Sequence, residues 1–143
     1  MKRVILLVLG VALAAAPALG QPRSFSCLGA EKLEDDVFSI AFARGSATIG
    51  EAARSPLAAA IEAALAAPER NICILGHAGQ EGGATTSIQL AAQRARAVTN
   101  AMAAQGIDGE RLRAEARSAQ FSPTVRAAEP PSRSVTIVLM PPP

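Results

Sequence analysis

The sequence contains no tryptophan, no tyrosine and only 4 phenylalanines, although 50% of its 143 residues are hydrophobic. A hydrophobic core must therefore be built from isoleucine, leucine, valine and alanine. The length is enough for one such core but not for two. No internal repeat is visible, so we expect a single domain.

Histidine is almost absent, because His77 is the only one in the chain. A zinc site needs three or four ligands, and a nucleophilic enzyme needs a base beside its nucleophile. Too few candidate ligands stand near His77, and no Ser-His-Asp arrangement can be argued. We therefore expect no enzyme, no bound metal and no cofactor.

Beyond the first residues the chain has no excess of positive charge. The formal net charge is +2, and Lys2 and Arg3 account for all of it. Lys32 is the only other lysine, and the remaining arginines are spread along the chain instead of forming a run. Without a basic patch, the chain offers no electrostatic surface for nucleic acid or for a membrane.

Apolar runs long enough to span a bilayer are missing too. The longest, residues 4–16, is shorter than the roughly 20 residues that a transmembrane helix needs. Basic residues precede it and small residues up to Gly20 follow it, as in a secretory signal peptide. We expect a signal peptide over residues 1–20 and a mature periplasmic chain that begins near Gln21, without stable membrane insertion. An uncleaved anchor is the alternative.

Cysteine occurs only twice, as Cys27 and Cys73. In an exported chain an oxidising compartment favours a disulfide between them. The alternative is that Cys73 is a small buried apolar residue and Cys27 a free thiol, and the spacing does not decide between the two. A lipid anchor on Cys27 is disfavoured, because Arg23 and Phe25 interrupt the small residues that a lipoprotein signal requires.

The first half of the predicted fold begins after a leader, residues 21–36, that shows no sustained period. Residues 37–42 alternate as a strand. Ser55 followed by Pro56 predicts a helix start, and Pro68 predicts its end. In that helix, Leu57, Ile61 and Leu65 follow one another at spacings of four and give one apolar stripe.

The second half begins with a short β-branched strand over residues 71–75 and a flexible loop containing Gly79, Gly82 and Gly83. A second helix is expected to begin near Thr86 or Ser87 and to end before Gly106. Its inward stripe consists of Ala91, Ala95, Val98 and Met102. Two further strands follow, over residues 111–116 and 135–139, with a proline-marked loop between them at Pro123, Pro130 and Pro131.

This order of elements predicts an α/β (α+β) fold, βαβαββ, in which helices pack on a mixed sheet. The domain is expected to occupy residues 37–140, after the leader.

The stretch of residues 76–82, Gly-His-Ala-Gly-Gln-Glu-Gly, followed by Leu90, Arg94 and Val98, resembles a known signature. It is similar, without a gap, to the motif G-H-T-D-x-x-G and L-S-x-x-R-A-x-A-V of the OmpA-like C-terminal domains. Arg133 with the strand after it resembles the N-R-R-V-E-I strand of the same family. The resemblance implies a βαβαββ domain that binds peptidoglycan noncovalently, through the diaminopimelate of its stem peptide.

The resemblance also implies site residues. Arg94 matches the arginine that binds the ligand carboxylate, and a guanidinium fork suits that planar group. Gly79 replaces the aspartate that binds the ligand ammonium, Glu81 is a substitute carboxylate or a solvated loop residue, and Ser87 replaces an asparagine. His77 ends the strand in a structural role.

Two functions follow from these departures. The first is a peptidoglycan-binding module with a weakened site that depends on Arg94. Restoring the carboxylate by Gly79→Asp should strengthen it, provided that Gly79 does not need a positive φ. The second is a degenerate domain that serves as a scaffold for envelope proteins of the cell wall or outer membrane.

Overall fold

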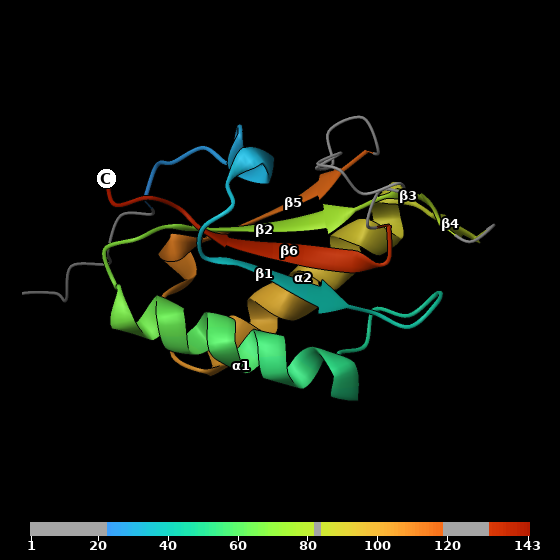
Figure 1. Ribbon diagram of the computed structural model, residues 1–143, viewed down its shortest axis with the longest axis horizontal. Coiled ribbons are helices and arrows are strands. Elements are labelled where there is room, and N and C mark those ends of the chain that lie inside the picture. The colour runs from blue at the N-terminus through green and yellow to red at the C-terminus, as the bar shows by residue number, and fades with distance from the viewer. Residues whose placement is uncertain (1–22, 82–83, 119–131) are drawn as a thin grey trace, which may run out of the picture.

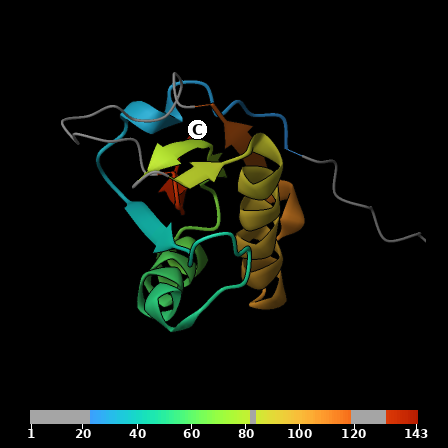
Figure 2. The ribbon, with the colours of Figure 1, turned by 90° about the vertical axis from the view of Figure 1, so that its right-hand side faces the viewer.

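The computed structural model describes residues 23–81, 84–118 and 132–143, without the side chains of Glu81 and Ala84. The expected signal peptide and the proline-marked loop lie outside the described residues. Two helices, α1 (Glu51–Ala66) and α2 (Ile88–Ala104), cover one face of a four-stranded sheet, and the leader covers the other (Figure 1, Figure 2). No helix in these ranges is both long enough and apolar enough to serve as a membrane span.

The sheet contains β1 (Val37–Ala41), β2 (Ile72–His77), β5 (Leu112–Arg117) and β6 (Ser134–Leu139), in the order β1-β6-β2-β5. β2 and β5 are parallel, whereas β6 is antiparallel to both of its neighbours, β1 and β2. A parallel pair needs a crossover between its strands, and α2 supplies it. The mixed sheet with helices packed on it is therefore confirmed.

Helix α1 begins one turn earlier than Ser55 and Pro56 predict. Its first residue follows Gly50, so Pro56 lies inside the helix. Packing explains the difference, because Ala53 is completely buried and the core holds this turn in place. The buried face of the helix consists of Ala53, Leu57, Ala60 and Ala64.

The apolar stripe predicted for α1 lies only partly in the core. Leu57 is buried and Ile61 is half-buried, but Leu65 is 51% exposed. Residues four apart advance by about 40° around a helix at each step, so three of them leave the face on which they start. The helix consequently keeps an apolar edge beside the core.

Helix α2 has the ends and the inward face that the sequence predicts. The Ser87 hydroxyl accepts a hydrogen bond of 3.0 Å from the Leu90 N–H, and Gly106 follows the helix with a φ of 93°. All four residues of the predicted inward stripe are buried. The helix can lie close to β2 because Gly76 has no side chain. A Cβ at this position would collide with the Ala91 carbonyl.

The segment after β2 is not simply a flexible loop. Gly79–Glu81 forms β3 and Ala84–Thr86 forms β4, and the two strands pair as an antiparallel hairpin. The glycines in this segment indicated a loop, whereas the β-branched Thr85 and Thr86 favour a strand opposite them.

The leader packs on the sheet although its sequence shows no period. Its short 3₁₀ helix, η1 (Ala30–Lys32), helps to form a second small core on the face opposite α1 and α2 (Figure 2). This second core contains Cys27, Ala30, Cys73, Leu75 and Val138.

A disulfide joins the leader to β2 in this second core. Of the two states that the sequence left open, the structure contains the bonded one, between Cys27 and Cys73, with Cα atoms 5.7 Å apart. Arg117 supports the connection, because it pairs with Glu31 at 3.0 Å and donates to the Cys27 carbonyl at 2.8 Å.

Replacing both cysteines, Cys27→Ser with Cys73→Ser, should lower the free energy of unfolding. The bond closes a loop with a sequence separation of 46, for which chain entropy gives about 4 kcal/mol. Urea unfolding of the exported protein, with and without a reductant, measures the difference. Two free thiols in the denatured, unreduced wild type would show that the bond does not form.

Candidate functional site

The residues selected by the resemblance converge at the carboxyl end of β2. His77 ends this strand, and Gly79 begins β3, where it pairs with Thr86 of β4. Thr86 accepts a hydrogen bond from Arg94 of α2. Arg133 directly precedes β6, whose first residues lie beside the last residues of β2. The structure thus brings four of the predicted residues to one end of the sheet.

Arg94 is completely buried, although its side chain is long and charged. Four hydrogen bonds from all three nitrogens hold it in place. They run from Nε to the Ser46 carbonyl (2.7 Å), from Nη1 to the Ser132 carbonyl (3.2 Å) and the Thr86 hydroxyl (3.4 Å), and from Nη2 to the Ala43 carbonyl (3.2 Å). Arg94 therefore connects α2 to three other parts of the fold.

These acceptors satisfy the donors of Arg94 but do not cancel its charge. Among the described side chains, no carboxylate forms an ion pair with it. Burial lowers the pKa of Arg94, and the neighbouring Arg133 guanidinium lowers it further. Arginine nevertheless stays protonated in proteins. Two positive charges, those of the buried Arg94 and the exposed Arg133, therefore lie near each other at this end of the sheet.

Gly79 occupies the position of the family aspartate, with a φ of 149°. Residues with a side chain rarely adopt this region of the backbone map. The expectation that Gly79→Asp strengthens binding required that residue 79 should not need a positive φ. This requirement is not met, because Gly79 has a positive φ.

His77 is completely buried, and its Nε2 lies 2.8 Å from the Thr136 hydroxyl of β6. Burial is the main cause that lowers the pKa of His77 from 6.5 to about 4, and the charge of Arg117 adds to it. The imidazole is thus neutral at pH 7 and connects β2 to β6. This geometry agrees with a structural role.

Two other predicted residues do not meet Arg94 in the described structure. The Ser87 hydroxyl is used to cap α2. The backbone of Glu81 belongs to β3, but its side chain lies outside the described part of the chain.

The sequence did not indicate the acceptors that hold Arg94. Three of them are backbone carbonyls, which any residue type supplies, and the fourth is the buried hydroxyl of Thr86. The sequence did not indicate the contact with Phe42 either: the centre of the Phe42 ring lies 5.5 Å from the Arg94 guanidinium carbon. A cation over an aromatic face is stabilised there.

This arrangement suits the binding of an anion better than catalysis. Its accessible charged group is a guanidinium, which donates hydrogen bonds and does not exchange a proton near neutral pH. Within the described ranges, no three His, Cys, Asp or Glu side chains come together as metal ligands would.

Comparisons with known proteins agree with this fold. The sequence model of the OmpA family matches residues 41–135. One similar structure is the OmpA-like domain of FopA1 from Francisella tularensis subsp. tularensis SCHU S4, with a TM-score of 0.59 and 20% identity over 76% of this chain and 79% of that one. Another is the peptidoglycan-associated lipoprotein from Burkholderia pseudomallei (TM-score 0.59, 21% identity, 72% and 90% covered).

A third similar structure is the cell wall anchor of the T6SS from Pseudomonas aeruginosa, with a TM-score of 0.52 and 23% identity over 73% of this chain and 80% of that one. None of the curated proteins compared with the chain matches it.

The buried His77 should make the fold sensitive to mild acid. Its pKa is about 4 in the folded state and about 6.5 when unfolded. Its contribution is therefore complete above pH 6.5 and is lost as the pH falls toward 4. At pH 5 the free energy of unfolding should be about 2 kcal/mol lower from this group alone.

Urea unfolding at pH 7, 6 and 5 measures this loss of stability, with His77→Gln as the control. An equally steep loss in His77→Gln would assign the effect to other groups.

The positive φ of Gly79 should make Gly79→Asp and Gly79→Ala destabilising by similar amounts, about 1 to 3 kcal/mol, because both add a Cβ. Thermal unfolding of the two variants measures this, and their comparison separates backbone strain from the charge. A Gly79→Asp variant as stable as the wild type would contradict the requirement for glycine.

Proposed function

The chain belongs to the OmpA family, and on that basis we propose that it is an exported module that binds peptidoglycan noncovalently. Two proteins of similar structure are a peptidoglycan-associated lipoprotein and a cell wall anchor. The signal-like N-terminus places the proposed activity in the periplasm, at the cell wall or the outer membrane. The domain over residues 37–140, with its leader, acts there as a binding module without enzymatic activity or cofactor.

One observation carries the proposal: a buried cation without a described carboxylate partner lies beside an exposed one. Arg94 has neutral hydrogen-bond acceptors, so its charge adds to that of Arg133. An anion that approaches this end of the sheet contacts the exposed Arg133 first. The charge of Arg94, which is buried beneath the surface, adds to the attraction. The carboxylate of a stem-peptide diaminopimelate has the required charge and a planar shape.

The proposed site is weaker than that of a family member with an aspartate at the position of Gly79. A hydrogen bond to a charged group contributes about 1.5 to 3 kcal/mol, so loss of the ammonium partner should weaken binding by about ten- to a hundredfold. Peptidoglycan is a dense polymer, and simultaneous contacts can offset part of this loss.

A second function, as a scaffold for envelope proteins, is favoured by the complete burial of Arg94. In that case Arg94 serves the fold alone, as its four hydrogen bonds show that it can, and the ligand site of the family is no longer used.

Binding to isolated sacculi that contain diaminopimelate distinguishes the two functions. Arg94→Ala would remove four hydrogen bonds and so test the fold together with the site. Arg133→Gln is cleaner, because this side chain is exposed. We expect Arg133→Gln to weaken sedimentation of the protein with sacculi by about ten- to a hundredfold, as loss of a charged hydrogen bond implies.

The matched control is Arg96→Gln, which removes the same charge from another exposed position. It should bind like the wild type. Equal binding by all three proteins, with their folds intact by circular dichroism, would reject the site and favour the scaffold.

A further inference from the structure

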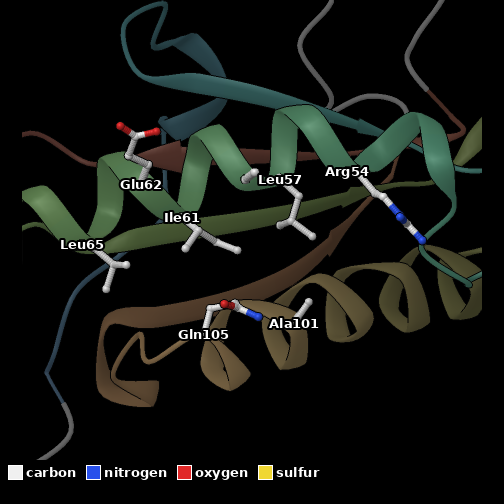
Figure 3. Close-up of a pocket in the computed structure, with 8 residues that line it drawn as sticks. Arg54, Leu57, Ile61, Glu62, Leu65, Ala101 and Gln105 are labelled. Carbon is white, nitrogen blue, oxygen red and sulfur yellow. The ribbon is translucent and has the colours of Figure 1, made fainter.

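An apolar groove runs between α1 and α2, away from the candidate site. Its volume is about 530 Å³. Leu57, Ile61 and Leu65 of α1 point into it, and Ala101 of α2 and Gln105, the residue after α2, form the opposite side (Figure 3). This is the edge of α1 that lies beside the core.

The groove leaves substantial apolar surface in contact with water. Leu65 is 51% exposed and, together with Leu28 and Ile88, is one of three exposed large apolar side chains in the described ranges. Ala58 also lines the groove and is exposed, so another backbone can approach α1 closely there. Exposed apolar surface of this kind marks interaction sites.

Opposite charges flank Ala58 on α1. Arg54 lies four residues before it and Glu62 four residues after it, and both line the groove. Arg54 also contacts Glu51 at 3.3 Å, but both side chains are more than 70% exposed (75% and 84%), so this ion pair restrains it little.

We propose that the groove binds the α1 helix of a second copy of this chain, related by a two-fold axis at Ala58. A two-fold axis perpendicular to α1 makes the two copies of this helix antiparallel. The residue four positions before Ala58 in one copy then lies beside the residue four positions after Ala58 in the other copy. Arg54 therefore lies against Glu62 of the partner subunit, and Glu62 lies against Arg54 of the partner subunit. The charge pattern of α1 is complementary to itself, which a foreign partner does not require.

The apolar contacts agree with this placement. The partner helix lies over the gap between α1 and α2, where it covers Ile61 and Leu65 and touches Ala101. Both candidate peptidoglycan sites stay outside the interface, because they lie at the carboxyl ends of the two β2 strands. The dimer is independent of the proposed function, but it would present two binding sites to one polymer.

Sedimentation equilibrium of the mature protein over a series of concentrations tests the proposal. The wild type should form dimers that weaken as the salt concentration rises, because exposed ion pairs are screened. Arg54→Glu places a second carboxylate against Glu62 of the partner subunit at each end of the paired helices. The repulsion should weaken dimerisation at least tenfold. Arg96→Glu, which makes the same charge change outside the groove, should leave dimerisation unchanged.

The double variant Arg54→Glu, Glu62→Arg decides the identity of the occupant. It reverses both charges, so a second copy with the same changes restores the pairing and the dimer. The proposal would be overturned if Arg54→Glu left the strength of dimerisation unchanged, or if the double variant stayed monomeric. A wild type that is monomeric at all concentrations would overturn it too and leave the groove to another partner. Circular dichroism of each variant confirms that the fold is intact.

Discussion

The fold depends on the way in which it accommodates one buried cation. Arg94 has lost its contact with water, and its donors are satisfied by carbonyls from the segment after β1 and the turn before β6, together with a hydroxyl of β4. Without those acceptors the burial of a guanidinium would be strongly unfavourable. The segments that supply them are far apart in sequence, so Arg94 fixes their positions relative to α2. The same positive charge lies near that of Arg133 at this end of the sheet.

Other arginines act on the backbone in a similar way. Arg111 is 3% exposed and donates to the Ala64, Ala67 and Arg70 carbonyls, which satisfies acceptors at the end of α1. Arg70 donates to the Leu139 and Met140 carbonyls at the end of β6. This chain, which has many arginines and few lysines, therefore uses several guanidinium groups as internal connections.

The sequence predicted most elements, because their signals are local. The alternation around Val135 and the cap at Ser87 identified β6 and α2. The start of α1 was misplaced because burial of Ala53 overrides the signal of Pro56. The packing of the leader could not be predicted either, since a segment held by one disulfide and several arginines needs no period. For the site, a motif selected Arg94, but no residue pattern indicates that backbone carbonyls will surround it.

The disulfide has a mechanical consequence. Arg23, at the start of the described leader, contacts the Pro68 and Glu69 carbonyls, near the amino end of β2. A pull applied to the chain there reaches β2 through the covalent bond at Cys73 and passes along the strand toward His77 and the candidate site (Figure 1). β2 has a hydrogen-bonded neighbour on each side, β6 and β5. Tension along it must therefore shear both ladders at once instead of opening one bond at a time.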